Sequence, residues 1–355
     1  MLVTRRQLLQ SSAVLAPAAA FLPGFLLRQL ADPPPAASAS TSNRILVIVQ
    51  QAGGNDGLNT IVPYGEGRYY DLRPNIAIPQ QDVIPLDKEV GFHPSLAKFK
   101  TLWDSGKLAV VEGVGYPNPN FSHFQSMDIW HYADPAVKIR QGWLGRYLAT
   151  LGEADNTFSG VAIGRRLPPE LYSPRASVAV VESVPLYQFQ GDPRFPAAKP
   201  ARIETLVKMY GSGVDASYRG HLNKTFQSAY LSSSSVVEAD KAFKSAPLYP
   251  DSPLTPGLRI LASAIVGGLG IRVGHVVIGG WDTHASQKPD HARLLRNLSD
   301  AIYAFYEDLK AHGKDDNVVI MTWSEFGRRA KSNASDGTDH GSAAPLFIIG
   351  KSVKG

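Results

Sequence analysis

The chain has 355 residues, of which 44% are hydrophobic and 19% charged; this composition is typical of a globular protein and excludes a disordered chain. The net charge of +5 is small, and no basic cluster contains aromatic residues, so the sequence does not indicate a nucleic-acid partner. Because the chain has no cysteine, disulfides and thiolate nucleophiles are excluded, and any metal site must use histidine, aspartate, glutamate and water.

The N-terminus predicts an export signal. Residues 4–9 (TRRQLL) place paired arginines before a mostly apolar stretch that reaches Leu27, a pattern typical of signals read by the twin-arginine translocation machinery. The alternative is a transmembrane anchor, but prolines, a glycine and serines interrupt the stretch. We therefore expect residues 1–43 to be a signal peptide and a Pro/Ala/Ser spacer. The mature domain, residues 44–355, is expected to be periplasmic or secreted, with no stable membrane span.

Residues 44–60 (RILVIVQQAGGNDGLNT) predict a buried strand that ends in a tight turn. Residues 45–50 are mostly aliphatic and do not alternate with polar residues, which suits a strand buried on both faces. Asp56 in the turn could hold a metal or a polar substrate, because ligands bind at the carboxyl edge of an open parallel sheet. It could equally serve only as a turn cap, as Asp and Asn often do.

A second informative segment surrounds Ser122. Residues 108–111 predict a short buried strand, and residues 113–122 (GVGYPNPNFS) predict a turn-rich loop that leads into a helix over 123–132. Ser122 occupies the N-cap position of this helix. It is either a simple cap or a nucleophile or oxyanion-binding position, because free N–H groups and the helix dipole favour negative charge there.

The middle of the chain offers less chemistry. Residues 143–151 predict a helix, and residues 160–164 and 177–181 predict short strands. Residues 185–250 mix Pro-rich loops with helical segments, and we interpret them as an insertion or cap over the sheet. The helices expected within this insertion cover residues 200–210, 217–232 and 235–245.

The C-terminal part alternates helices and strands. Its expected elements are a helix from residue 258, a strand over 274–280, a helix over 289–312, and strands over 317–323 and 345–349. Strands separated by helices of this length predict an α/β fold, a doubly wound and mostly parallel sheet with helices on both faces. The chain ends soon after the last strand, where we expect further residues to complete the sheet or cover its edge.

Acidic and histidine side chains recur where the expected strands end. They are Asp56 after the first strand, Asp282 and His284 after the strand over 274–280, Glu325 after the strand over 317–323, and Asp339 and His340 before the last strand. Because the carboxyl ends of parallel strands lie on one edge of the sheet, these side chains can converge. Carboxylate and imidazole groups suit a divalent cation, with zinc expected first and manganese or calcium as alternatives.

Six motifs resemble those of a known family. They are the twin-arginine start, GGNDGLNT at 53–60, PNPNFSHFQSMDIW at 117–130, GGWDTHASQ at 279–287, WSEFGRR at 323–329 and TDHGSAAP at 338–345. Together they are similar to an uncharacterised family of exported bacterial proteins, a domain of unknown function in the alkaline phosphatase–sulfatase-like superfamily. The resemblance covers nearly the whole mature chain and is weak in residues 185–250.

The resemblance implies an alkaline-phosphatase-like fold, with one or two metal ions at the carboxyl edge of the sheet and a serine or threonine nucleophile at a helix start. Ser122 matches the nucleophile, and Asp56 matches the acidic ligand after the first strand. A first metal site is complete under this resemblance and consists of Asp282, His284 and His340. The second site, with Asp56 and Glu325, lacks the histidine that relatives carry after the penultimate strand. One metal site is therefore expected rather than two.

Three functions are compatible with these residues. The first is a metal-dependent hydrolase of phosphate or sulfate esters, in which His123 or Arg328 contacts an anionic small-molecule or saccharide substrate. The second is a non-catalytic protein on the same scaffold that binds envelope or extracellular polysaccharide, which the missing histidine favours. The third is a structural partner in an envelope assembly. Catalysis requires the Ser122 hydroxyl to lie within reach of the metal ligands rather than to act only as a cap.

Overall fold

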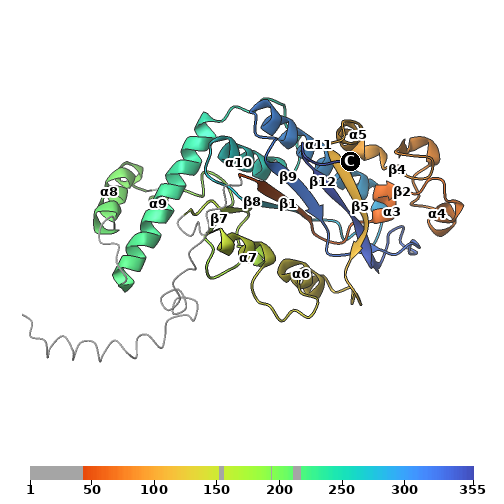
Figure 1. Ribbon diagram of the computed structural model, residues 1–355, viewed down its shortest axis with the longest axis horizontal. Coiled ribbons are helices and arrows are strands. Elements are labelled where there is room, and N and C mark those ends of the chain that lie inside the picture. Colours follow the sequence, from red (N-terminus) through yellow and green to blue (C-terminus); the bar gives the residue numbers. More distant parts are fainter. Residues whose placement is uncertain (1–42, 152–155, 193, 211–216) are drawn as a thin grey trace, which may run out of the picture.

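The computed structural model describes residues 43–151, 156–192, 194–210 and 217–355, and a seven-stranded sheet runs through its centre (Figure 1). The strand order is β5-β12-β9-β1-β8-β6-β7. The strands are β1 (Ile45–Gln51), β5 (Leu108–Gly115), β6 (Gly160–Ile163), β7 (Val178–Val181), β8 (Val273–Ile278), β9 (Val318–Trp323) and β12 (Ala343–Ile349). β1 is parallel to β8 and β9, and β6 is parallel to β7 and β8. The predicted mostly parallel sheet is confirmed.

β1 is the central strand of the sheet. It pairs with β8 along one edge and with β9 along the other, so its backbone groups are bonded on both sides. Val47, Ile48 and Val49 have no exposed surface. Aliphatic and β-branched side chains of this kind suit a pleated strand between two packed layers. The prediction of a strand buried on both faces at residues 45–50 is therefore confirmed.

Helices cover both faces of the sheet (Figure 1). Those on one face are α5 (Ala97–Asp104), α10 (Thr255–Val266) and α11 (Gln287–Ala311), and those on the other are α6 (His123–Tyr132) and α7 (Trp143–Thr150). In α11 the predicted apolar stripe is buried and consists of Leu294, Leu298, Ile302, Phe305 and Leu309. Apolar residues at steps of three and four form one face of a helix, which here packs on the sheet.

The direction of β12 and β5 brings two further loops to the carboxyl edge of β1, β8 and β9. β12 is antiparallel to β9, so it begins where β9 ends, and β5 is antiparallel to β12, so it ends at the same edge. The sequence predicts a short buried strand over 108–111, but β5 extends to Gly115 as an edge strand and leaves Val111 exposed. The loop after β5 carries Ser122, and His340 precedes β12, so both residues lie near this edge.

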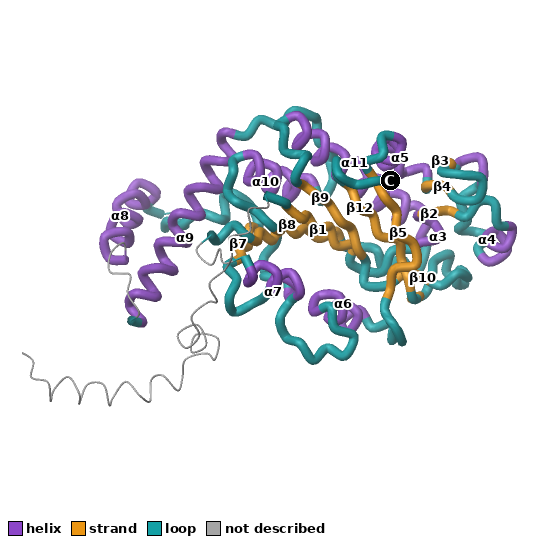
Figure 2. The backbone as a smooth tube through the Cα atoms, viewed as in Figure 1, coloured by secondary structure: helices purple, strands orange, loops and turns teal. Residues whose placement is uncertain are grey.

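One predicted boundary in the segment 185–250 is wrong. The sequence predicts two helices over 217–232 and 235–245, but Tyr218–Ala242 form the single helix α9. The serines at 232–235 lie within it, and each hydroxyl donates a hydrogen bond to a carbonyl three or four residues earlier. Together with α8 (Lys199–Tyr210), α9 lies at the β7 end of the molecule (Figure 2).

The remaining elements are short. The helices are α3 (Gly57–Thr60) and α4 (Gly67–Leu72), with 3-10 helices at Gln80–Asp82, Pro94–Leu96, Pro169–Leu171 and Pro196–Ala198. The strands are β2 (Ile61–Val62), β3 (Ile84–Pro85) and β4 (Gly91–Phe92) in one small sheet, and the pair β10 (Gly327–Arg328) and β11 (His340–Gly341).

Within the described residues, no helix has the length and apolar character needed to span a membrane. The predicted signal peptide and spacer cover residues 1–43, and residues 1–42 of them lie outside the described residues.

Candidate metal centre

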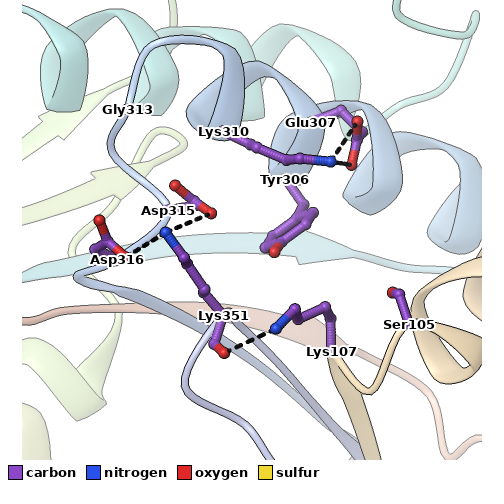
Figure 3. Close-up of a pocket in the computed structure, with 9 residues that line it drawn as sticks. All are labelled: Ser105, Lys107, Tyr306, Glu307, Lys310, Gly313, Asp315, Asp316 and Lys351. Atoms are coloured by element: carbon purple, nitrogen blue, oxygen red, sulfur yellow. Dashed lines mark hydrogen bonds and ion pairs between the residues drawn. The ribbon is translucent and has the colours of Figure 1, made fainter.

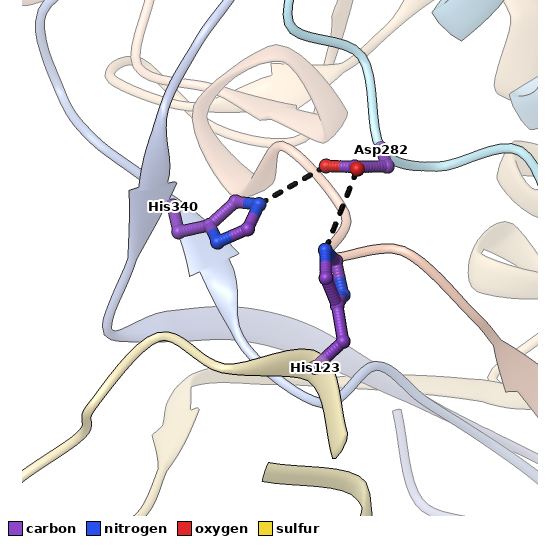
Figure 4. Close-up of side chains that lie close together, drawn as sticks. All are labelled: His123, Asp282 and His340. Atoms are coloured by element: carbon purple, nitrogen blue, oxygen red, sulfur yellow. Dashed lines mark hydrogen bonds and ion pairs between the residues drawn. The ribbon is translucent and has the colours of Figure 1, made fainter. Parts of the chain in front are cut away.

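Three side chains from segments far apart in the sequence meet at the carboxyl edge of the sheet. His123 begins α6, Asp282 follows β8, and His340 precedes β12. Figure 4 shows both imidazole rings directed toward the Asp282 carboxylate. One potential ligand atom from each residue lies within 4.8 Å of the other two. Among the described residues, these two histidines and one aspartate form the group of side chains whose spacing would suit a bound metal ion.

The turn after β1 leaves just enough room for Asp282. Gly53 has φ +129° and Gly54 has φ +84°, conformations that glycine adopts readily and other residues do not. A Cβ on Gly53 would lie 2.4 Å from the backbone nitrogen of Asp282. The glycines that the sequence assigns to a tight turn therefore also allow the turns after β1 and β8 to pack against each other.

His284 joins the group through the same carboxylate. Its Nε2 atom lies 2.9 Å from Asp282 Oδ1 and 3.0 Å from His340 Nε2, and His340 Nε2 lies 3.1 Å from Asp282 Oδ1. His340 Nδ1 lies 2.8 Å from the carbonyl oxygen of Phe121. Because a carbonyl can only accept, this contact places a proton on Nδ1, and Nε2 of the neutral ring then has a lone pair. The structure thus brings together Asp282, His284 and His340, as the resemblance implies.

His123 contacts two carboxylates. Its Nε2 atom lies 3.4 Å from Asp282 Oδ2, and its Nδ1 atom lies 2.8 Å from Glu325 Oε1. The same Glu325 oxygen accepts a hydrogen bond from the N–H of Gly53 at 2.8 Å, and the Glu325 side chain has no exposed surface. The sequence predicts a substrate contact for His123 and a metal-ligand role for Glu325, and both stay predictions. In the structure His123 presents a nitrogen to Asp282, and Glu325 contacts the other nitrogen of the ring.

Arg328 anchors Asp282. Its Nη2 atom donates to Asp282 Oδ1 at 2.7 Å and to the carbonyl of Trp281 at 3.0 Å. Its Nε atom donates to the carbonyl of Gly54, and its Nη1 atom donates to that of Thr338. The side chain has no exposed surface. The sequence predicts that Arg328 contacts an anionic substrate, but the buried guanidinium already uses its donors within the protein.

The surroundings of Asp282 favour its charged form. Partial burial raises the pKa of its carboxyl group, but the guanidinium of Arg328, which donates a hydrogen bond to it, and the nearby His340 and His284 outweigh burial and lower the pKa to about 2. The carboxylate is therefore ionised at neutral pH. A carboxyl group must be ionised to act as a metal ligand.

Asp56 forms a buried ion pair with Arg73. Arg73 Nη1 lies 2.6 Å from Asp56 Oδ2, and neither side chain has exposed surface. Gln287 donates to the same oxygen. Burial raises the pKa of Asp56, but Arg73, His291 and Gln287 outweigh it, so the pKa lies below its ordinary value. Asp56 makes no side-chain cap bond, and it is not part of the group of potential ligands, so its predicted role at the metal stays a prediction.

Ser122 occupies the predicted N-cap position of α6, but its hydroxyl makes no cap hydrogen bond. Its two neighbours in the chain belong to the candidate centre, since the Phe121 carbonyl meets His340 and His123 is itself a potential ligand. Phe121 has φ +61°, a left-handed conformation that costs a non-glycine residue about 1 kcal/mol or more. The loop is therefore strained beside Ser122, and a role as a simple cap is not supported.

Sequence reasoning missed two parts of this arrangement. Arg73 lies in an irregular stretch where no motif connects it with Asp56, although a buried aspartate needs a counter-charge. Phe121 contributes a backbone carbonyl, which no residue type reveals. The predicted contact of His123 with a substrate stays a prediction, and its place next to Ser122 was the signal that could have located it at the centre.

A cavity of about 410 Å³ lies at the opposite edge of the sheet (Figure 3). Lys107 precedes β5, Asp316 precedes β9, and Lys351 follows β12, and these strand ends are remote from Asp282. Lys351 pairs with Asp316 at 2.6 Å, so charges in this cavity compensate one another. None of the predicted site residues lines it.

The sequence matches one family model, DUF1501, described as a protein of unknown function, over residues 112–355. No curated protein matches the sequence. Among solved structures, the chain is similar to Ps i-CgsB in complex with k-i-k-neocarrahexaose, with a TM-score of 0.36 and 9% identity, over 87% of this chain and 66% of that one.

Two further solved structures are similar to the chain. One is the C-terminal periplasmic domain of EcEptC from Escherichia coli in complex with Zn, with a TM-score of 0.39 and 10% identity, over 90% of this chain and 78% of that one. The other is the lipoteichoic acid synthase LtaP from Listeria monocytogenes, with a TM-score of 0.30 and 10% identity, over 88% and 69% of the two chains. All three are distant likenesses.

Proposed function

The chain belongs to the DUF1501 family, whose function is unknown, and we propose from the geometry of its site that it is an exported, metal-dependent hydrolase of phosphate or sulfate esters. Export is proposed from the twin-arginine pattern at residues 4–9. The ester classes are proposed from the resemblance of the motifs around Ser122, Asp282 and His340 to the alkaline phosphatase–sulfatase-like superfamily. The metal is proposed from the structure of the centre.

The convergence of three imidazole nitrogens on Asp282 carries the proposal. The Nε2 atoms of three histidines lie 2.9, 3.1 and 3.4 Å from its carboxylate oxygens; these are His284, His340 and His123. The Nε2 lone pair of His340 faces both this carboxylate and a second imidazole nitrogen at 3.0 Å. Lone pairs and negative charge repel at such distances unless a proton or a cation lies between them. Ligands of a tetrahedral zinc ion lie about 3.3 Å from one another, which fits these separations.

The donor set fits a divalent cation, with zinc as the first choice because imidazole nitrogens suit it better than manganese or calcium. When bound, the cation would polarise an ester oxygen and lower the pKa of a hydroxyl group or water beside it. We propose one metal site rather than two. The reason is that Arg73 already compensates the charge of Asp56 inside a buried ion pair.

Ser122 is the proposed nucleophile. Its hydroxyl makes no cap bond, and its neighbours Phe121 and His123 hold its backbone beside the centre. Attack of Oγ on phosphorus or sulfur would form a covalent ester while the alcohol leaves with a proton, and water would then release the anion. The first turn of α6 supplies backbone N–H groups and the positive end of a helix dipole to the anionic group.

Hydrolysis of aryl phosphate and aryl sulfate esters by the zinc-loaded protein tests this proposal. We expect turnover of one of the two ester classes, a loss of at least about a hundredfold in Ser122→Ala, and unchanged zinc content in that variant. Ser235→Ala, which removes a hydroxyl on the α9 helix, is the matched control and should keep full activity. A zinc-loaded protein that hydrolyses neither class would contradict the proposal and favour the polysaccharide-binding alternative.

A further inference from the structure

We infer that Glu325 is a positioning residue, which holds the proton of His123 on Nδ1 so that the Nε2 lone pair of this ring faces Asp282. Binding of a cation at Nε2 depends on the proposed function. The arrangement itself depends only on the contacts among Glu325, His123, Asp282 and Gly53. It gives Glu325 a different role from the metal ligand that the resemblance implies.

Glu325 offers His123 a hydrogen-bond acceptor. Its Oε1 atom accepts the N–H of Gly53 at 2.8 Å, and its Oε2 atom lies 3.3 Å from the Ser324 hydroxyl, which makes a shorter bond of 2.7 Å to the carbonyl of Gln51. The same Oε1 atom lies 2.8 Å from His123 Nδ1; an oxygen that already accepts from Gly53 offers its other lone pair to the ring, so this contact favours a ring that donates from Nδ1. A neutral imidazole carries one proton, so its Nε2 atom, 3.4 Å from Asp282 Oδ2, has a lone pair.

The ring of His123 is also held in place by its neighbours. Its centroid lies 4.9 Å from that of Phe326 and 4.5 Å from that of His340. Phe326 follows Glu325 in the chain, so the segment after β9 supplies both the surface beside the ring and the carboxylate at its edge. A carboxylate that binds one imidazole nitrogen while the other binds a metal is a recurrent arrangement, in which the carboxylate fixes the tautomer and the direction of the ring.

Asp339 provides a matched comparison. Its Oδ1 atom lies 3.5 Å from Nδ1 of His284, so it makes the corresponding carboxylate–imidazole contact to another histidine of the centre. The Asp339 side chain is 49% exposed, whereas that of Glu325 is fully buried. A longer contact in water orders a ring far less than a short one in a buried site. Glu325 should therefore matter much more than Asp339.

Nuclear magnetic resonance of the metal-free, full-length protein at pH 8 tests the tautomer directly, because long-range proton–nitrogen correlations show which ring nitrogen carries the proton. A His123→Phe variant identifies the signals of this ring. We expect the Nδ1–H form in the wild type and a mixture of tautomers in Glu325→Met. Zinc titrated by calorimetry should bind about 10 to 100 times more weakly to Glu325→Met, and less than about threefold more weakly to Asp339→Asn.

Glu325→Gln distinguishes positioning from ligation, since its amide oxygen can still accept from His123. We expect it to keep the Nδ1–H form and to bind zinc more tightly than Glu325→Met. An Nε2–H ring in the wild type would overturn the inference, as would equal zinc affinity in the wild type and Glu325→Met. The tautomer is measured without metal or substrate. An Nδ1–H ring in a protein that hydrolyses no ester would therefore count against the proposed function and leave the role of Glu325 supported.

Discussion

Arg73 and Asp56 form an ion pair of 2.6 Å in which neither side chain has exposed surface. The guanidinium of Arg73 also donates to the backbone carbonyls of Arg329 and Ala330, in the loop that joins β10 to β11. The pair therefore ties the turn after β1 to the loop that leads to His340. Two of the segments that form the carboxyl edge are held together by one arginine.

Replacement of Arg73 by methionine should destabilise the fold strongly. The Asp56 carboxylate would remain buried without its counter-charge, and breaking a buried pair in this way costs about 3–5 kcal/mol. The free energy of unfolding from urea denaturation measures the loss. Arg165→Met is the matched control, because its ion pair with Glu182 is also 2.6 Å long but the Arg165 side chain is 82% exposed, so little loss is expected. Equal losses in the two variants would contradict the account.

Gly53→Ala should disturb the candidate metal centre. The new Cβ would lie 2.4 Å from the backbone nitrogen of Asp282, and the φ of +129° is strained for alanine, so the turn must move away from Asp282. We expect a lower melting temperature and weaker zinc binding. Gly106→Ala has a positive φ with no atom within 4 Å of the new Cβ, so it should cost about 1 kcal/mol and leave zinc binding unchanged. Wild-type zinc affinity in Gly53→Ala would refute this expectation.

Ser122→Ala should leave the stability of the protein nearly unchanged. Its hydroxyl makes no cap hydrogen bond, so the change in the free energy of unfolding should stay within about 0.5 kcal/mol. Ser217 provides the contrast, because its hydroxyl accepts the N–H of Gly220 at the start of α9 at 3.1 Å. Ser217→Ala should cost about 1 kcal/mol. A larger loss in Ser122→Ala than in Ser217→Ala would show that Ser122 is a structural cap after all.

Two buried histidines should make the fold sensitive to mild acid. Burial lowers the pKa of His93 to about 3 and that of His291 to about 4, from the ordinary 6.5. Between pH 6.5 and 4 the unfolded chain binds protons that the folded chain does not. The free energy of unfolding should therefore fall with decreasing pH, by about 1.4 kcal/mol per pH unit for each histidine, with no further loss below the folded pKa values.

Urea denaturation between pH 7 and pH 4.5 measures this dependence. His291→Gln removes one of the two titrating groups, so the slope of stability against pH should become shallower by the contribution of one histidine. A slope that His291→Gln leaves unchanged would show that other groups cause the sensitivity to acid.

Much of the fold was predictable because its strongest signals are local. The continuous aliphatic run of β1 suits a strand buried on both faces, and the apolar stripe of α11 has the helical spacing of a helix that packs on a sheet. The extent of β5 and the continuity of α9 were not predictable. The first depends on pairing with β12, a strand more than 200 residues later in the chain. In the second, the helix continues through four serines at 232–235, a residue type that is unfavourable in helix interiors.

The candidate site was predictable only in part, for a similar reason. Strand ends on one edge of a parallel sheet implied that Asp282, His284 and His340 would meet, and they do. The partners of Arg328 and Glu325 are set by atoms within 4 Å that come from segments far away in the sequence. Residue type alone leaves open whether a charged side chain faces a ligand or another part of the protein.

Metal content is the most direct test of the central claim. The purified full-length protein, supplied with zinc, manganese and calcium in turn and then dialysed, should retain one divalent cation per chain, with zinc bound most tightly. His340→Ala should lose it, and His312→Ala should keep it, because the imidazole of His312 contacts Asp308 on α11 and not the centre. A wild-type protein that retains none of the three cations would contradict the account.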